Sequence, residues 1–395
     1  FIVLSGRTDP AGIRIQGENE MLDLQEIRNK IDEIDAGILS SFEKRMELAE
    51  QVAAYKISAG KPVFDGKREA EKLKNLEEAA STPFNARGAR ELFQHIIAVS
   101  RMRQYQLLAE RGVSKESYEQ VDSLPAENAR VVFQGVEGAY SFAAMRSFFG
   151  EKIRSTHVET WREAMEQVAA GEADYAVLPI ENSTAGSVSD IYDLMTEYPN
   201  YIVGEEILEI RHTLMGLPGA SLEDIRTVLS HPQALYQCRH FLESHPQWKQ
   251  EKMLNTAMAA EKVARDQDKS QAAIASRFAA EHFGLRILQE EGLAGESNST
   301  RFVILSNQKR FVKGAGKISI CLELPHTCGS LHGILAHFDY NGLNMTKIES
   351  RPIPGRPWEY RFFIDFEGNL AEAAVKNALL GIRSEAAALR ILGNY

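Results

Sequence analysis

The chain has 395 residues, of which 44% are hydrophobic and 25% charged, and this composition is ordinary for a soluble globular protein. Its length predicts two to four domains, each with its own hydrophobic core. The net charge of -10, from 45 basic and 55 acidic residues, argues against a nucleic-acid-binding surface over the whole molecule.

Cysteine content and hydropathy exclude further classes. Cys238, Cys321 and Cys328 are too few and too scattered for a disulfide framework or a zinc site, so no metal is expected. Because no run of about twenty apolar residues occurs, we expect a cytoplasmic protein without membrane contact. Residues 1–20 lack a starting Met and the features of a signal peptide, and we interpret them as extraneous or disordered.

The first segment, residues 21–111, has a helical pattern throughout. Apolar residues recur at three-, four- and seven-residue steps from about Leu22 to Ser58, which predicts one helix of about 35 residues. Shorter helices are predicted at 65–80 and 85–111. The long helix cannot bury its apolar stripe in a small monomer, so the three helices indicate an all-α, intertwined homodimer. The stripe comprises Ile27, Ile31, Ile34, Ile38, Phe42, Ala49, Val52 and Tyr55.

The middle of the chain has another rhythm. Residues 112–128 lose periodicity and are interpreted as a linker, whereas residues 129–310 alternate short apolar strands with helices, which predicts an α/β domain. Functional loops in such folds follow the carboxyl ends of strands. The loops with the sequences GVEGAYS, PIENSTAG, SHPQ and NSTRF are therefore candidates for a site.

The last segment, residues 316–395, is predicted to be α+β. Strands are expected at 317–324, 344–353, 358–366 and 389–395, with helices at 330–340 and 371–385. This β-α-β-β-α-β order is ferredoxin-like. The whole chain is thus predicted to be multidomain.

Polar residues of the helical segment form a pattern that spans 77 residues. Asp65, Arg68 and Glu69 share one helix face, and Ser100 lies one turn before Gln104. Each residue alone is more often solvated helix surface. Together with Arg28, Arg45 and Lys56 they match the all-helical chorismate mutases position by position, so this segment resembles that family.

The resemblance implies a cofactor-free pericyclic rearrangement of chorismate to prephenate, which needs no nucleophile, acid or base. Catalysis must then come from holding the compact conformer and from stabilising charge on the ether oxygen. Lys56 and Gln104 are the implied catalytic donors to that oxygen, Glu69 holds the ring hydroxyl, and Arg28 reaches into the partner's site. The implied chorismate-binding set is Arg28, Arg45, Lys56, Asp65, Arg68, Glu69, Ser100 and Gln104.

Residues 129–310 resemble prephenate dehydratases through Thr300-Arg301-Phe302 and the three other loops. The resemblance implies a two-lobed fold, like a periplasmic solute-binding protein, with prephenate in the cleft. Thr300 is expected to hydrogen-bond or protonate the leaving hydroxide, with help from a partner that the sequence does not name. The implied prephenate-binding residues are Asn182, Ser230, Gln237 and Arg301. Alternatively, the PIENSTAG and SHPQ loops are ordinary helix starts with capping residues.

Residues 316–395 resemble the ACT domains of prephenate dehydratases, which bind amino acids between subunits. The resemblance implies two groups of phenylalanine-binding residues. They are Gly329, Ser330, Leu331 and His332 at a helix start, and Glu349, Ser350, Arg351 and Pro352 at a strand end. Ser330 and His332 depart from the Ala and Val that the family more often has. The local alternative is a helix start and a strand end without ligand.

Taken together, the resemblances imply a bifunctional enzyme of phenylalanine biosynthesis that phenylalanine inhibits. Its expected partners are chorismate, prephenate, phenylalanine and a second copy of the chain, without nucleic acid. The alternatives are a non-catalytic amino-acid sensor and a prephenate dehydratase whose helical segment serves only for dimerisation. Intact charged positions in both enzyme segments favour the bifunctional enzyme.

Overall fold

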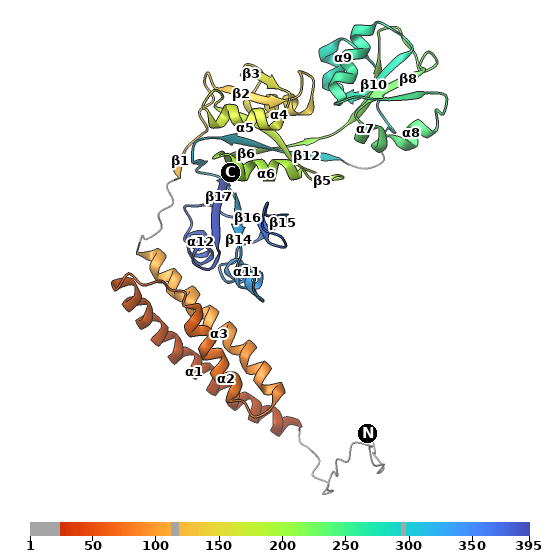
Figure 1. Cartoon of the computed structure of the whole chain (residues 1–395). Coiled ribbons are helices and arrows are strands. Elements are labelled where there is room, and N and C mark those ends of the chain that lie inside the picture. The colour runs from red at the N-terminus through yellow and green to blue at the C-terminus, as the bar shows by residue number, and fades with distance from the viewer. Residues whose placement is uncertain (1–23, 112–117, 294–297) are drawn as a thin grey trace, which may run out of the picture. The chain divides into compact units, whose positions relative to one another are not determined.

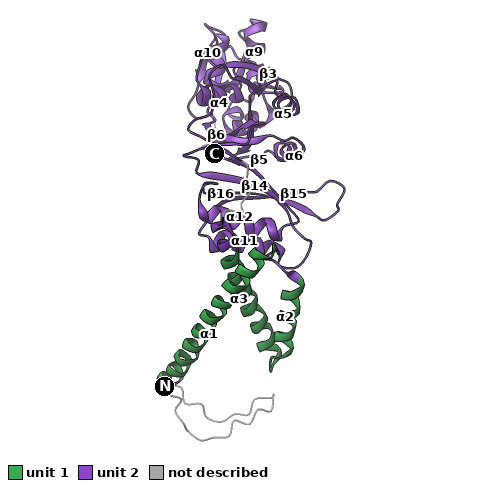
Figure 2. Cartoon of the chain, turned by 90° about the vertical axis from the view of Figure 1, so that its left-hand side faces the viewer, with its two compact units in different colours: residues 1–61, 67–104 green, residues 62–66, 105–395 purple. Residues whose placement is uncertain are grey.

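The computed structural model describes residues 24–111, 118–293 and 298–395 (Figure 1). The chain divides into two compact units, one of residues 1–61 and 67–104 and the other of residues 62–66 and 105–395 (Figure 2). The expectation for residues 1–20 lies outside the described part of the chain. Among the described residues, no helix has both the length and the apolar character needed to cross a bilayer.

The first unit is helical, as expected. It contains α1 (Leu24–Ser58), α2 (Gly66–Glu78) and most of α3 (Pro83–Glu110). The 35-residue α1 ends where Gly60 adopts a positive φ of 63°, shortly before Pro62. The three predicted helices therefore agree with the structure to within about two residues at each end.

One long face of α1 is exposed in the single chain. Its large apolar side chains are between 37% exposed, at Ile27, and 63% exposed, at Ile34. The set is Leu24, Ile27, Ile31, Ile34, Ile38, Leu39, Leu48, Val52 and Tyr55. A contiguous apolar face of this kind marks an interaction surface.

The second unit contains a ten-stranded sheet. Its order is β15-β16-β14-β17-β6-β12-β4-β2-β3, and β5 pairs with β4. The strands that belong to the α/β segment are β2 (Arg130–Gln134), β3 (Arg154–Val158), β4 (Tyr175–Asn182), β5 (Gly186–Ser187), β6 (Tyr201–Glu209) and β12 (Ser299–Ser306). Their helices are α4 (Tyr140–Phe149), α5 (Trp161–Ala169) and α6 (Ser189–Glu197). Both faces of this part are covered by buried apolar clusters.

A five-stranded sheet forms a separate layer, with the order β11-β7-β10-β8-β9 (Figure 1). The chain enters it from β6 into β7 and leaves it from β11 into β12. Its strands are β7 (His212–Gly216), β8 (Thr227–Ser230), β9 (Lys249–Lys252), β10 (Gln271–Ser276) and β11 (Arg286–Gln289). Its helices are α7 (Pro232–Gln237), α8 (Arg239–Glu243), α9 (Thr256–Asp266) and α10 (Arg277–Phe283).

The C-terminal segment has the expected β-α-β-β-α-β order. It runs through β14 (Lys317–Glu323), α11 (Ser330–Tyr340), β15 (Met345–Pro352), β16 (Tyr360–Glu367), α12 (Ala373–Glu385) and β17 (Ala388–Asn394). The pairs β15–β16, β16–β14 and β14–β17 are antiparallel. A parallel pairing of Gly393 with Ile202 joins β17 to β6, and a Cβ at Gly393 would overlap the carbonyl oxygen of Ile202. Glycine is required at this close approach.

The predicted linker at 112–128 is wrong over the part that the structure describes. Residues 112–117 lie outside the described residues, but β1 (Glu119–Val121) pairs in parallel with β13 (Arg310–Val312). In addition, the Tyr118 hydroxyl donates to the carbonyl oxygen of Ile391 at 2.9 Å. Residues 118–128 are thus part of the second unit.

Candidate active sites

A cleft of about 610 Å³ opens between the two sheets of the second unit. The first sheet contributes Asn182 and Thr300, while the five-stranded sheet and its helices contribute His212, His231 and Gln237. Polar residues from both layers therefore face one volume, in the position expected for the loops that follow the strands.

Thr300 reaches the cleft because of strand alternation. Thr300 and Phe302 line the cleft, whereas Arg301 points to the opposite face of β12. Asn182 is the register partner of Thr300 on β4, and its Nδ2 donates to Thr300 Oγ1 at 2.9 Å. Thr300 Oγ1 thus accepts a hydrogen bond, and its own proton is available for donation into the cleft.

The cleft has a surface suited to anions without a cationic side chain. Among its described lining residues there is no Lys or Arg. The N-terminal ends of five helices lie there instead, at Tyr140 of α4, Trp161 of α5, Val188 before α6, His231 before α7 and Asn255 before α9. Free backbone N–H groups and helix dipoles at such ends favour carboxylates.

Two histidines of the cleft are buried enough for desolvation to lower the pKa of each imidazole, which favours the neutral form near pH 7. His231 caps α7, and its Nδ1 accepts the backbone N–H of Gln233 at 3.2 Å. A neutral His231 consequently has its proton on Nε2.

Ser230 is not among the residues that line the cleft, contrary to the expectation that it binds prephenate. Its side chain is fully buried, and its Oγ donates to the carbonyl oxygen of Ile274 at 2.6 Å, which ties β8 to β10. Ser230 directly precedes His231, so its position fixes the start of α7.

Arg301 is also placed differently from the expectation that it binds a substrate carboxylate. Its guanidinium donates to Glu205 Oε2 at 2.7 Å, Asp365 Oδ2 at 2.7 Å and the Tyr395 hydroxyl at 2.6 Å. Only 11% of the side chain is exposed. Burial alone would lower the pKa of Arg301, but Tyr395, Asp365 and Glu205 raise it above its ordinary value. Arg301 therefore joins the α/β part to the C-terminal strands.

In the first unit, four of the residues assigned to chorismate lie together. The Arg45 guanidinium donates to Ser100 Oγ and to the carbonyl oxygen of Ile96, and burial lowers its pKa while the nearby Glu69 carboxylate opposes that shift. Gln104 Nε2 donates to the carbonyl oxygen of Ser100 at 3.2 Å. Gln104 Oε1 is buried with no hydrogen-bond partner among the described residues. An orphaned buried acceptor is unusual and marks a candidate ligand position.

The other members of that set lie elsewhere on the helices. Lys56 is half-buried near the end of α1, and Arg68 is exposed on α2, where it pairs with Glu71 at 3.4 Å. Exposed Asp65 directly precedes α2. Arg28 is exposed and precedes Arg45 by 17 residues on α1, which corresponds to about 25 Å along the helix axis. Within a single chain, Arg28 therefore does not reach Arg45 and the residues grouped with it. Arg101, which sequence reasoning did not single out, forms an ion pair with Glu69.

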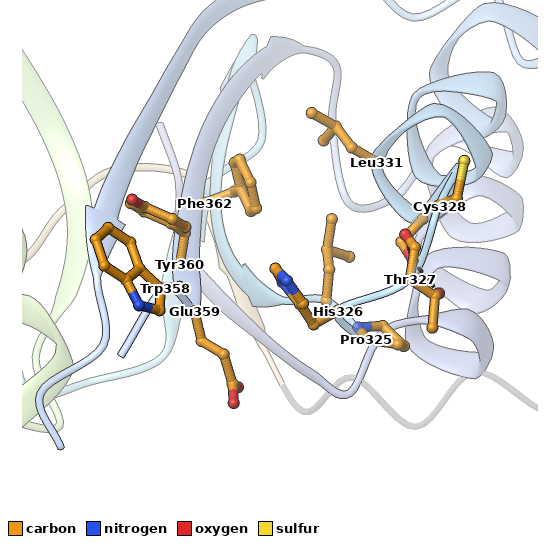
Figure 3. Close-up of a pocket in the computed structure, with 11 residues that line it drawn as sticks. Pro325, His326, Thr327, Cys328, Leu331, Trp358, Glu359, Tyr360 and Phe362 are labelled. Carbon is orange, nitrogen blue, oxygen red and sulfur yellow. Dashed lines mark hydrogen bonds between the residues drawn. The ribbon is translucent and has the colours of Figure 1, made fainter. Parts of the chain in front are cut away.

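The C-terminal segment contains a pocket of about 430 Å³ (Figure 3). Leu331 and Phe362 point toward one another across it, with Trp358 and Tyr360 on one side. Ser330 and Leu331 line it, and Gly329, with a φ of 83°, caps α11 beside them. Gly329 and His332 are not among the lining residues. The remaining lining residues are Leu324, Pro325, His326, Thr327, Cys328 and Glu359.

The strand-end residues expected to bind phenylalanine do not line this pocket. Glu349 Oε2 accepts from Ser187 Oγ at 2.7 Å, and Arg351 pairs with Asp193 at 2.6 Å. Ser350 and Pro352 are register partners of the pocket residues Phe362 and Tyr360. Within one chain, the two predicted halves of the phenylalanine site thus face different surroundings.

Comparison with known proteins agrees with this arrangement. The family model of chorismate mutase type II matches residues 27–105, and that of prephenate dehydratase matches residues 131–310. A bifunctional chorismate mutase/prephenate dehydratase from Enterobacter agglomerans is 34% identical over 376 residues, covering 93% of this chain and 95% of that protein. This chain belongs to the bifunctional chorismate mutase/prephenate dehydratase family. The two enzyme segments expected from the sequence are thereby confirmed.

Solved structures resemble about two thirds of this chain. A prephenate dehydratase from Arthrobacter aurescens, in complex with L-Phe, has a TM-score of 0.62 and 32% identity, covering 67% of this chain and 89% of that chain. GqqA, described as a quorum quenching acylase, has a TM-score of 0.60 and 31% identity, covering 67% of this chain and 96% of its own. Proteins with different described activities share this fold, so the chemistry must be argued from the residues of the cleft.

Proposed function

We propose that this bifunctional chain rearranges chorismate to prephenate in the helical domain, residues 21–111, and converts prephenate to phenylpyruvate in the α/β domain, residues 129–310. The observation that carries the proposal is the Asn182–Thr300 pair, which presents a hydroxyl donor in a cleft suited to anions. The product of the first site is the substrate of the second. Neither step needs a cofactor.

In the mutase site, Arg45 binds a substrate carboxylate, and Lys56 and Gln104 donate to the ether oxygen as negative charge develops there. Support comes from the half-buried positions of Arg45 and Lys56 and from the burial of the Gln104 amide, whose Nε2 lies beside Ser100. Glu69, held by Arg101, accepts from the ring hydroxyl. Asp65, Arg68 and Ser100 complete the binding set.

A homodimer supplies the remaining mutase residue. Arg28 lies about 25 Å from Arg45 along α1, so it serves the site of a second chain. The exposed apolar face of α1 supports the same assembly, because pairing two such helices would bury it.

In the dehydratase site, the helix N-terminal ends hold the two carboxylates of prephenate, and Asn182 and Gln237 orient the ring. The carbon–carboxylate bond breaks, its electron pair passes into the ring, and the carbon–oxygen bond to the hydroxyl breaks. Thr300 donates to that departing oxygen, which leaves as water, while the carboxylate leaves as carbon dioxide. The proton is replaced from solvent. The two layers around the cleft serve as the two lobes of a fold like that of periplasmic solute-binding proteins.

Residues 316–395 serve as an ACT domain that binds phenylalanine and inhibits the dehydratase. The apolar pocket beside the start of α11 has the character needed for an aromatic side chain, and the helix end favours a carboxylate (Figure 3). The L-Phe complex of the Arthrobacter relative supports the choice of ligand. We assign Glu349, Ser350, Arg351 and Pro352 to the side of the site contributed by a second chain.

The deciding experiment supplies purified protein with chorismate and follows prephenate and phenylpyruvate over time, with and without phenylalanine. Transient prephenate followed by phenylpyruvate is expected. Binding of these ligands without turnover would favour the sensor, and phenylpyruvate formed only from added prephenate would favour the single-activity enzyme. Fractionation of cells is expected to recover the protein in the cytoplasm.

A further inference from the structure

The geometry of the cleft points to a further residue of the dehydration step. We propose that His212 is a positioning residue that holds the Thr300 hydroxyl, through three intervening side chains, in the orientation that donates into the cleft. The proposal rests on the dehydratase function assigned to this cleft.

The donor-to-acceptor direction of the hydrogen bonds between His212 and Thr300 is determined at Asn182. Its Oδ1 accepts the backbone N–H groups of Thr184 at 3.1 Å and Ala185 at 2.9 Å. Because backbone N–H groups only donate, this atom must be the oxygen, and the amide nitrogen must face Thr300. The same oxygen also accepts the hydroxyl proton of Thr184 at 2.8 Å.

The remaining orientations follow from that anchor. Since the Thr184 hydroxyl donates to Asn182, its oxygen accepts from Gln237 Nε2 at 3.0 Å. Gln237 Oε1 is then turned to His212 Nε2, 2.8 Å away. An amide oxygen only accepts, so His212 must have a proton on Nε2.

His212 is itself held in place. Its side chain is buried at the start of β7, directly after the chain crosses from the first sheet, and its Nδ1 lies 3.3 Å from the Tyr140 hydroxyl. With the proton on Nε2, Nδ1 of a neutral ring is an acceptor beside the Tyr140 hydroxyl, which also lies 3.1 Å from the carbonyl oxygen of Arg211. The donor at Nε2 points to Gln237 Oε1, which also accepts from Asn298 Nδ2 at 3.3 Å, and the shorter bond from His212 is the main restraint on the Gln237 amide.

The connection crosses the cleft from one layer to the other. His212 and Gln237 belong to the five-stranded sheet and its helices, whereas Thr184, Asn182 and Thr300 belong to the first sheet. Hydrogen bonds that all run in one direction polarise one another, so the last donor, the Thr300 hydroxyl, becomes a better donor. The five side chains thereby align this hydroxyl only when the two layers stand at the separation seen here.

The first test replaces the imidazole. His212→Leu removes the Nε2 donor, and we expect the dehydratase kcat to fall between about ten- and a hundredfold while KM stays within about threefold. His212→Gln places an amide N–H near the position of Nε2 and is expected to restore most of kcat. A kcat of His212→Leu equal to that of the wild type would overturn the proposal, as would a Gln variant no better than the Leu variant.

A second variant avoids the buried position. Thr184→Val removes the hydroxyl from an exposed residue, and Thr184→Ser keeps it. If His212 acts through Thr184, the double variant His212→Leu with Thr184→Val loses no more kcat than the worse single variant. Losses that multiply would show independent, structural effects. Mutase turnover in every variant reports the amount of folded first unit, and failure of the wild type to dehydrate prephenate would refute the proposed function instead.

Discussion

Thr300 and Arg301 are consecutive residues of β12, yet their side chains lie on opposite faces of the sheet. Thr300 accepts from Asn182 in the cleft, while Arg301 donates to Asp365 and Tyr395 of the C-terminal segment. One strand thus connects the proposed chemistry with the proposed regulatory domain. The same pair suggests separate predictions for the two functions.

Replacing Thr300 by Val should remove dehydration and spare the mutase. The variant keeps the shape of the side chain but has no hydroxyl to donate, so phenylpyruvate formation should fall at least about a hundredfold. Prephenate made from chorismate should then accumulate. Its amount can be measured by converting it to phenylpyruvate with acid and reading the absorbance of that product. Thr300→Ser is the matched control and should retain much of the activity. Phenylpyruvate at the wild-type rate in Thr300→Val would remove Thr300 from the mechanism.

Replacing Arg301 by Leu should destabilise the second unit. The substitution leaves Asp365, only 8% exposed, without a charge partner, and the free energy of unfolding should fall by about 3 kcal/mol. Trp161, Trp248 and Trp358 all belong to the second unit, so tryptophan fluorescence during heating reports on that unit. Arg162→Leu is the control, because its ion pair with Glu197 is exposed and should contribute little. Equal melting temperatures for the two variants would contradict this role of Arg301.

Replacing Lys56 by Ala should lower mutase turnover by about two to three orders of magnitude, the cost of losing a donor to the transition state. Dehydratase turnover measured with added prephenate should not change. Because Gln104 does not ionise, wild-type mutase activity should also show no steep change between mildly acidic and neutral pH. An equal loss of both activities in Lys56→Ala would indicate misfolding, and a sharp rise on acidification would contradict the role of Gln104.

One cysteine should report on the phenylalanine pocket. Cys328 is exposed and lines the pocket, whereas Cys238 and Cys321 are buried. Burial raises the pKa of both buried thiols to about 12, so at pH 8 almost none of either is in the reactive thiolate form. A thiol reagent should therefore modify one cysteine per folded chain, and phenylalanine should slow that reaction. The Cys328→Ser variant should not react until it unfolds. A labelling rate that saturating phenylalanine does not change would argue against this pocket as the binding site.

Feedback inhibition should be weakened by Glu349→Ala. The variant is expected to bind phenylalanine less tightly in calorimetry and to need more of it for half-inhibition, and prephenate analogues should weaken phenylalanine binding in the wild type by the reciprocal factor. Asp190→Ala, an exposed acidic residue at the start of α6, is a control for loss of one negative charge. Inhibition unchanged in Glu349→Ala would refute the assignment.

Deleting residues 316–395 is a less clean test, because Cys321, Phe363 and Leu392 belong to the same buried cluster as residues of the α/β part. The ring centroids of Phe363 and Tyr192 lie 4.8 Å apart. Removal of the segment would expose this core, so loss of inhibition and loss of folding would coincide.

The sequence predicted the regular elements well where periodicity was strong. The three helices of the first unit and the helix 330–340 agree closely with α1, α2, α3 and α11. The sequence predicted the segment NSTRF as a loop, although Ser299 to Phe302 lie in β12. The strand was missed because Thr300 and Arg301 are polar: Thr300 lines the cleft, and Arg301 binds Asp365 and Tyr395 on the other face. The pairing of β1 with β13 joins residues far apart in the chain, and no local pattern indicates such contacts.

The candidate site was predicted less completely than the fold. Family resemblance indicated Asn182, Gln237 and Thr300, which the structure brings together. It also indicated Ser230 and Arg301, whose side chains face a buried backbone carbonyl and the C-terminal strands. Strand alternation would have separated Thr300 from Arg301 had β12 been recognised.

Other residues of the cleft gave only weak signals in the sequence. His212 stands in the apolar stretch ILEIRHTLMG, where a single histidine is more often a core residue than part of a site. Its role depends on the crossing from β6 to β7, which brings it opposite the first sheet. Thr184 and Asn298 lie in the PIENSTAG and NSTRF segments that the sequence indicated, but their individual roles are recognisable only through their contacts.

The alternation along β12 also limits how this part of the gene can evolve. A one-residue insertion or deletion inside the strand would exchange the two faces, placing a guanidinium in the cleft and a threonine among buried carboxylates. The contacts of Thr300 in the cleft and those of Arg301 with the C-terminal strands would be lost together, because β4 and β6 hold β12 on either side. Descendants of this sequence should therefore vary in β12 by substitution alone and accommodate changes of length in the segments that flank it.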